Sequence, residues 1–185
     1  MKKFFLLVVA ALFCCVGYSQ AQTNEKKLTR EEKKAAQKAL DMSYFEEAKQ
    51  AIESQAFTLE ADRVIFKRGR SAFVTANTNF VTVNGEQSSV QVAFNTTLSG
   101  PNGIGGVTVD GRVSNYQVKT DKKGNVFVSF SVMGIGISAQ VNITLTHGSN
   151  QASVDIRPNF NSNRLTLTGT LLPLDKSNVF KGRSY

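Results

Sequence analysis

The fold of this chain is decided by residues 126–146, which read VFVSFSVMGIGISAQVNITLT. Apolar residues recur there at every second position, first as Val126, Val128, Phe130 and Val132 and then as Val141, Ile143 and Leu145. Successive side chains of a strand point to opposite faces, so this alternation predicts two antiparallel strands with one buried face and one solvated face. The glycines at 134 and 136, between the two runs, predict a bend or bulge.

The same alternation extends over the second half of the chain. It predicts eight strands, at 56–67, 71–83, 87–98, 106–119, 125–134, 136–147, 151–158 and 163–172. Turn signals such as Asn84-Gly85 separate them, and the apolar parity slips between Val113 and Tyr116, which indicates another bulge. The short links favour a meander. We therefore expect a mainly β fold that closes as an antiparallel β-barrel, with a two-sheet β-sandwich as the alternative.

A helix is expected before the strands, because residues 18–68 contain neither Gly nor Pro. The sequence Thr29-Arg30-Glu31-Glu32 matches a capping box, and small apolar residues follow at helical spacing as far as Ile52. A second box at Ser43–Glu46 leaves two alternatives open, one continuous helix or a break near residues 41–43. The apolar stripe is rich in Ala, so we expect the helix to lie close against the sheet, plugging one end or covering a flank.

The N-terminus carries the pattern of an export signal. Lys2 and Lys3 precede the uncharged run 4–16, and Ser19 and Ala21 supply small residues before Gln22. This order predicts a signal peptide over residues 1–21. The mature chain is then expected to be periplasmic and to have no transmembrane span. We divide the rest into an N-terminal helical segment at 22–55, an antiparallel β-domain at 56–175 and a C-terminal tail at 176–185.

The two cysteines, Cys14 and Cys15, both lie inside this signal. Cleavage would leave a mature chain without cysteine, so no disulfide would support it. The alternative is a lipid anchor to the envelope through Cys14 or Cys15. A bacterial lipidation site takes a small residue before the cysteine, whereas Phe13 precedes Cys14.

The chain is basic, with a formal net charge of +8. From residue 61 onward there are 13 Lys and Arg against 6 Asp and Glu. In an exported protein this excess suggests contact with an anionic envelope lipid, a glycan or an acidic protein, and not with nucleic acid; the oligomeric state is left open. The densest basic cluster is Lys67, Arg68 and Arg70, at a predicted hairpin tip, and we take these residues as a candidate anion or partner contact. A charged turn that protects a sheet edge is the alternative.

The residue inventory excludes much catalytic chemistry. His147 is the only histidine, and it falls in a predicted turn, where we expect it to be exposed. A His-based metal site or a Cys–His dyad cannot be assembled from these residues. The glycine-rich segment 100–106 lacks the Gly-Lys-Ser/Thr ending of a phosphate-binding loop, and a strand follows it rather than a helix. We predict no catalytic residue, no metal site and no cofactor, and hence no enzyme.

A weaker hypothesis is a carbohydrate hydrolase that uses Asp110 and Asp155. Both lie mid-strand on the solvated face by parity, and such an enzyme needs two carboxyl groups about 5–9.5 Å apart. Arg112 and Arg157 each follow two residues on, so ion pairing is the expected role of both acids. The favoured interpretation is a non-enzymatic ligand-binding module for an apolar or anionic envelope molecule. An envelope scaffold or interaction protein without a small ligand is the alternative.

Taken together, these patterns resemble a family of exported proteins from Bacteroidetes-type bacteria, the domain of unknown function 4251. The likeness covers residues 38–185. It rests on the charged helix leading into 57–70, the glycine-rich middle at 98–112, the strand pair at 126–146 and the last strand at 164–172. The resemblance implies an envelope protein with a lipocalin-type barrel and no defined activity. Many members look like lipoproteins, and the residues before Cys14 and Cys15 depart from that pattern.

Overall fold

The computed structural model describes residues 29–66, 68–93, 106–135, 137–159 and 164–182. The chain divides into two compact units, at residues 1–34 and 35–185. The described part of the first unit is the start of helix α2 (Arg30–Glu53). The Glu32 N–H donates to Thr29 Oγ1 over 3.3 Å and the Thr29 N–H donates to Glu32 Oε2 over 2.7 Å, which confirms the capping box. The predicted signal peptide at 1–21, with Cys14 and Cys15, lies outside the described residues.

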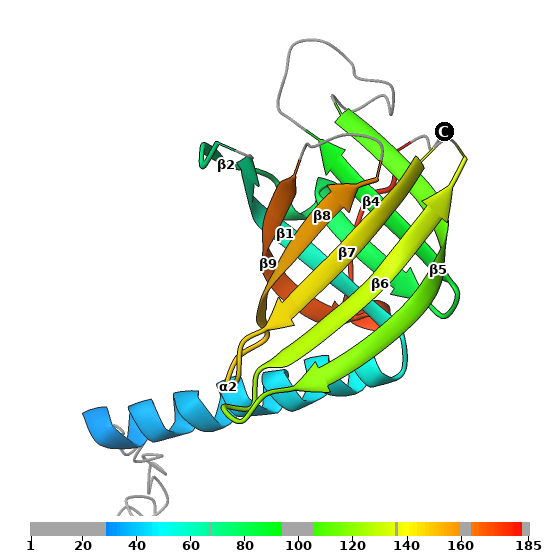
Figure 1. Ribbon diagram of the computed structural model, residues 1–185. Helices are drawn as coiled ribbons and strands as arrows, with labels where there is room; N and C mark the ends of the chain where they lie inside the picture. The colour runs from blue at the N-terminus through cyan, green and yellow to red at the C-terminus, as the bar shows by residue number, and fades with distance from the viewer. Residues whose placement is uncertain (1–28, 67, 94–105, 136, 160–163, 183–185) are drawn as a thin grey trace, which may run out of the picture. The chain divides into compact units, whose positions relative to one another are not determined.

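Nine strands follow in the second unit. They are β1 (Ala56–Phe66), β2 (Ser71–Phe73), β3 (Phe80–Asn84), β4 (Gln87–Ala93), β5 (Gly106–Thr120), β6 (Val126–Gly134), β7 (Ile137–Leu145), β8 (Gln151–Pro158) and β9 (Leu165–Pro173). Each strand from β3 to β9 pairs antiparallel with the next, and β1 pairs with both β3 and β9. Eight strands therefore close into an antiparallel barrel, and β2 is an added strand on β1 (Figure 1). The barrel is confirmed and the sandwich alternative is wrong.

The predicted strand at 71–83 is in fact interrupted. The short strand β2 is followed by a 3₁₀ turn, η1 (Ala76–Thr78), before β3 begins. Asn and Thr favour turns in this segment. Asn79 stabilises the break, because its backbone carbonyl accepts from the Ala61 N–H and its Oδ1 accepts from the Ala93 N–H, both over 2.8 Å.

The bulge expected between Val113 and Tyr116 is present. The register of β5 against β6 shifts between Ser114 and Gln117, and Asn115 adopts a φ of 56°. The shift turns the Tyr116 ring toward the core, where it packs against Phe130. Its hydroxyl donates to the backbone carbonyl of Ile52 near the end of α2 over 2.7 Å. One irregularity in a strand thus fastens the helix to the barrel.

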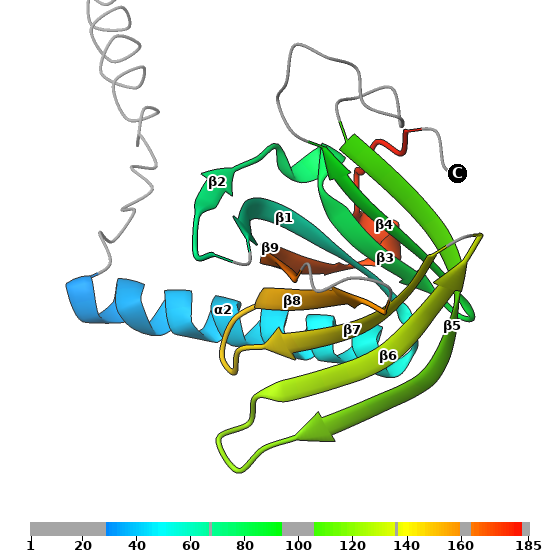
Figure 2. The same ribbon diagram turned by 45° about the horizontal axis from the view of Figure 1, so that its top comes forward.

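The helix closes one end of the barrel. From residue 35 to its end α2 is uninterrupted, so the alternative of a break near residues 41–43 is wrong. Its buried side chains join the inward-facing residues of the strands in a single apolar cluster; they are Phe45, Ala48, Ala51 and Ile52. Figure 2 shows the α2 ribbon close to the strands, and the small Ala side chains on the buried face of the helix allow this approach. Among the largest inward side chains, Phe57, Leu59, Phe130 and Leu171 have no measurable exposure, so side chains pack the described interior.

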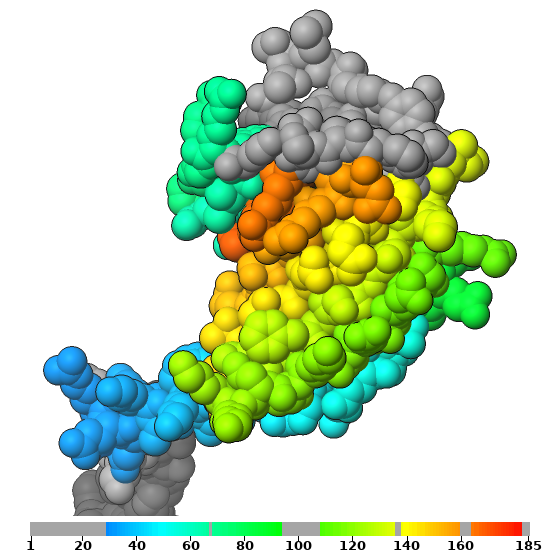
Figure 3. Space-filling model, viewed as in Figure 1, coloured from blue at the N-terminus to red at the C-terminus, as the bar shows by residue number. Residues whose placement is uncertain are grey.

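The links between strands alternate between the two barrel ends. The β3–β4, β5–β6 and β7–β8 turns lie at the end that α2 closes. We call the opposite end, which carries the β1–β2 and β6–β7 links, the loop rim. In the space-filling view the β2 segment stands out from the barrel wall at this rim (Figure 3).

The buried phenol of Tyr116 should make stability depend on pH. Burial raises the pKa of Tyr116 above its usual value. In the unfolded chain the phenol ionises near pH 10, whereas in the folded protein it stays protonated, so the free energy of unfolding should fall as pH rises past about 10. We expect Tyr116→Phe to lose about 1 kcal/mol at neutral pH, from the missing hydrogen bond, and to show a shallower alkaline fall. Urea titrations between pH 7 and pH 11 measure both; equally steep falls in the two proteins would contradict the assignment.

Candidate functional site

The predicted basic cluster does lie at a hairpin tip. The β1–β2 turn is closed by the Phe66 N–H donating to the Arg70 carbonyl and the Gly69 N–H donating to the Phe66 carbonyl, both over 2.8 Å. Arg68 and Arg70 are exposed on this turn. Lys67, the third predicted contact, lies outside the described residues. The structure therefore brings Arg68 and Arg70 together at the loop rim.

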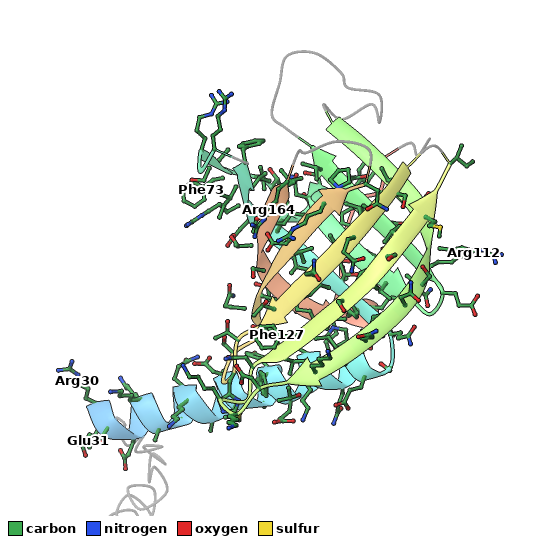
Figure 4. All side chains as sticks on the ribbon, in the orientation of Figure 1. Arg30, Glu31, Phe73, Arg112, Phe127 and Arg164 are labelled. Atoms are coloured by element: carbon green, nitrogen blue, oxygen red, sulfur yellow. The ribbon has the colours of Figure 1, made fainter. Side chains whose placement is uncertain are left out.

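Two further residues complete this surface. Arg63 of β1 is directly opposite Phe73 of β2, and its guanidinium carbon lies 4.9 Å from the Phe73 ring centroid. Phe73 is 81% exposed and projects from β2 away from the barrel (Figure 4). A cation held over an aromatic face is a favourable contact that keeps both side chains at the surface. We call Arg63, Arg68, Arg70 and Phe73 the basic hairpin; the sequence analysis missed two of them because their pairing depends on the register of β2.

A second apolar tip lies on the same loop rim. Met133 and Ile135, in and after the end of β6, are 58% and 85% exposed. The sequence marked this segment only as a bend between two strands. Large apolar side chains that stay mostly exposed at a hairpin tip add little to the fold itself, so they are candidates for contact with another molecule.

The carboxylate of Asp155 belongs to an ion pair with a partner other than the predicted one. Arg164 Nη2 donates to Asp155 Oδ2 over 2.5 Å and Nε donates to Oδ1 over 3.0 Å. Burial raises the pKa of Asp155, but the hydrogen bonds from Arg164 and Thr166 and the nearby guanidinium charges outweigh it, and the pKa lies below its usual value. Arg157 contributes only its charge, because a residue two positions along the same strand lies about 7 Å away. Arg164 instead approaches from the position just before the neighbouring strand β9.

Asp110 also differs from expectation. Its carboxylate accepts from Ser89 Oγ over 2.5 Å and pairs with Lys181 Nζ at 2.7 Å. Among the salt bridges of the described residues, its partner is Lys181 and not the predicted Arg112. Lys181 belongs to the C-terminal tail, whose position against the barrel the alternation of the strands could not predict. Asp110 in β5 and Asp155 in β8 are separated by β6 and β7, so the structure does not bring the two carboxylates of the hydrolase hypothesis together.

The C-terminal tail lies across the outer wall of the barrel as an extended segment, residues 177–182, which we call the tail strap. Ser177 Oγ donates to Glu60 Oε1 of β1 over 2.8 Å, and the Phe180 N–H donates to the Asn77 carbonyl over 2.7 Å. With the Lys181–Asp110 pair, the strap contacts outward-facing residues from β1 to β5. No alternation marked it in the sequence, because most of its hydrogen bonds to the barrel are made by its backbone.

Gln91 of β4 connects the strap to the wall. Its side chain is fully buried. Nε2 donates to the carbonyls of Thr78 and Phe180 over 3.0 and 2.7 Å, and Oε1 accepts from Thr108 Oγ1 and the Gly182 N–H, each over 2.7 Å. The amide thus uses both its donors and both acceptor positions.

With this geometry established, comparison with known families gives a match. A family model described as a domain of unknown function, DUF4251, matches residues 39–171. The chain belongs to the DUF4251 family. The chain is also similar to a crystal structure of a DUF4251 family protein from Bacteroides eggerthii DSM 20697, with 59% sequence identity and a TM-score of 0.68 over 80% of this chain and 99% of that one. Comparison with the curated proteins gave no match.

Three remaining expectations for this DUF4251 protein concern its histidine, a metal site and a membrane-spanning helix. His147 is exposed in the β7–β8 turn, as expected, and its ring meets that of Phe45 edge-on with centroids 4.9 Å apart. Within the described segments, no group of three or more His, Cys, Asp or Glu side chains could hold a metal ion. No helix in the described part of the chain is both long and apolar enough to cross a membrane.

Proposed function

We propose that this DUF4251 protein is an exported, non-enzymatic envelope protein that binds anionic lipid surfaces through its basic hairpin. The observation that carries the proposal is the exposed ring of Phe73 beside Arg63, with Arg68 and Arg70 on the adjoining turn. Guanidinium groups hydrogen-bond phosphate oxygens in pairs, and an aromatic ring partitions into the interfacial layer of a membrane. Export rests on the signal pattern at residues 1–21.

The packed interior supports a function at the surface. Lipocalin-type barrels hold a ligand inside, but an eight-stranded barrel is narrow enough for side chains to fill it. Here the inward side chains of β1 and β3 to β9 join those of α2 in one cluster. A ligand inside the barrel would have to displace them, so the favoured contact is at the loop rim, where apolar and basic side chains are exposed.

The expected strength follows from the charges. A basic residue near an anionic membrane contributes about 1 kcal/mol, so Arg63, Arg68 and Arg70 together should favour anionic over neutral vesicles by roughly 100-fold at low salt. Ile135, on the other tip of the loop rim, could enter the same interface and would add apolar contact that salt does not screen.

The test is co-sedimentation of the chain from residue 22 onward with vesicles. We expect binding to vesicles containing phosphatidylglycerol and little binding to pure phosphatidylcholine. The double variant Arg68→Gln/Arg70→Gln should weaken the anionic binding at least tenfold, because it removes two of the three charges. Phe73→Ser should weaken it further without changing its salt dependence.

The matched control is Lys122→Gln, which removes one exposed charge from the β5–β6 turn at the opposite end of the barrel. It should bind like the unmodified protein. Equal binding to anionic and neutral vesicles, or full binding by the double variant, would refute the proposal.

Mass spectrometry of the protein from its native cells tests export separately, with an N-terminus at Gln22 as the expected result.

A further inference from the structure

A second candidate site lies on the outer wall of the barrel, away from the basic hairpin. A shallow depression of about 110 Å³ spans the neighbouring strands β5, β6 and β7. Its lining residues on the outward face of these strands are Gln117, Lys119, Phe127, Ser129, Asn142 and Thr144. Small-molecule pockets that enclose a ligand measure about 300–1,000 Å³, so this depression suits contact with one face of a ring instead.

Phe127 gives the depression an exposed aromatic ring. The residue is 41% exposed, although its neighbours Val126 and Val128 are buried in the core. It points outward from β6, between Lys119 of β5 and Thr144 of β7 in the register of the sheet (Figure 4). The ring therefore adds little to the core and is available to pack against a molecule outside the barrel.

Hydrogen-bonding side chains border this ring. The next outward row across the sheet consists of Gln117, Ser129 and Asn142, which are paired with one another in the register. None of these three side chains hydrogen-bonds another group in the part of the chain that the structure describes. An amide has both donors and an acceptor, so this row can bond a ligand whose groups do both, as hydroxyl groups do.

In the described segments, the wall formed by β6 and β7 carries no charged side chain on its outward face. The outward side chains of these two strands are Phe127, Ser129, Ser131, Met133, Ser138, Gln140, Asn142 and Thr144. Charged residues usually occupy about a quarter or more of a solvated surface. A wall of hydroxyl and amide groups around one aromatic ring thus favours a neutral ligand that carries many hydroxyl groups.

We propose that this depression binds a β-glucose unit of a neutral glycan. A β-glucose ring holds its hydroxyl groups around its edge and C–H groups on both faces. One face would pack on the Phe127 ring, and the hydroxyl groups would bond the Gln117 and Asn142 amides beside it. The site uses no residue of the basic hairpin, so it stands or falls independently of the lipid-surface proposal.

The first test is a titration with cellopentaose, a neutral oligomer of β-glucose, with sorbitol as the open-chain analogue. Amide shifts in two-dimensional NMR should move saturably at Phe127, Ser129 and Asn142, with a dissociation constant on the order of millimolar for one stacked ring. Sorbitol at the same concentration of six-carbon units should cause shifts about tenfold smaller, because it has no ring face. Since cellopentaose has no charge, its affinity should change less than about twofold between about 0.05 and 0.5 M salt. Shifts that do not saturate, or equal shifts with sorbitol, would overturn the proposal.

Substitutions locate the contact. Phe127→Thr should weaken cellopentaose binding about tenfold and keep the thermal midpoint within about 2 °C, because the ring lies outside the core. Asn142→Ala should weaken binding about fivefold, through loss of the hydrogen bonds of one amide. The matched control is Phe180→Thr, which removes a ring that is 59% exposed on the tail strap and should leave cellopentaose binding unchanged. Full binding by Phe127→Thr, or an equal loss in Phe180→Thr, would contradict the site.

Discussion

Gly169→Ala is expected to lower the free energy of unfolding by about 3 kcal/mol, because it forces apart the strand pair that closes the barrel. Gly169 lies in β9 opposite Ala61 of β1. A Cβ at this position would lie 2.0 Å from the Glu60 carbonyl oxygen and 2.7 Å from the Ala61 Cα. Both are backbone atoms of the facing strand, so no side-chain rotation can relieve the collision. Thermal or urea unfolding followed by circular dichroism measures the loss.

The matched control adds the same methyl group where there is room. Gly148, in the β7–β8 turn, has a φ of 79° and no neighbour within 4 Å of its ideal Cβ. Gly148→Ala should lose only about 1 kcal/mol, the cost of a left-handed backbone for alanine. Similar losses in the two variants would show that the close approach of β1 and β9 is not needed for closure.

The sequence could predict the barrel because its strands obey a strict parity. Side chains such as Val128, Phe130 and Ile143 are buried as the alternation required. The bulge before Tyr116 was also predictable, because the apolar alternation of a paired strand shifts by one residue where an extra residue is inserted. Gly169 holds an inward position between Leu167 and Leu171, but the sequence could not show how closely the facing backbone of β1 approaches it.

The candidate sites were predictable only in part. The cluster at Arg68 and Arg70 is contiguous in sequence, so a hairpin was enough to bring it together. The partner of Asp155 was mispredicted, because parity tells which face a side chain occupies and not which residue of the next strand lies beside it.

Gln91→Ala should release the tail strap and lower the free energy of unfolding by about 3 kcal/mol. The substitution removes the acceptor of the Gly182 N–H and takes one hydrogen bond each from Thr108 Oγ1 and from the carbonyls of Thr78 and Phe180. Each buried polar group left unsatisfied costs about 1–3 kcal/mol, although water that enters beside a loosened strap would offset part of this. Urea denaturation gives the total.

Hydrogen exchange distinguishes release of the strap from general weakening of the barrel. In Gln91→Ala the amides of Phe180 and Gly182 should exchange far faster, while those of β6 and β7 should keep most of their protection. Gln151→Ala, which removes an exposed glutamine whose side chain donates a hydrogen bond to Thr170, should change stability by less than about 1 kcal/mol and leave the strap protected. If the strap amides in Gln91→Ala stayed as protected as before, the strap would be held by its contacts to Glu60, Asn77 and Asp110 alone. The buried amide would then serve only the pairing of β4 with β5.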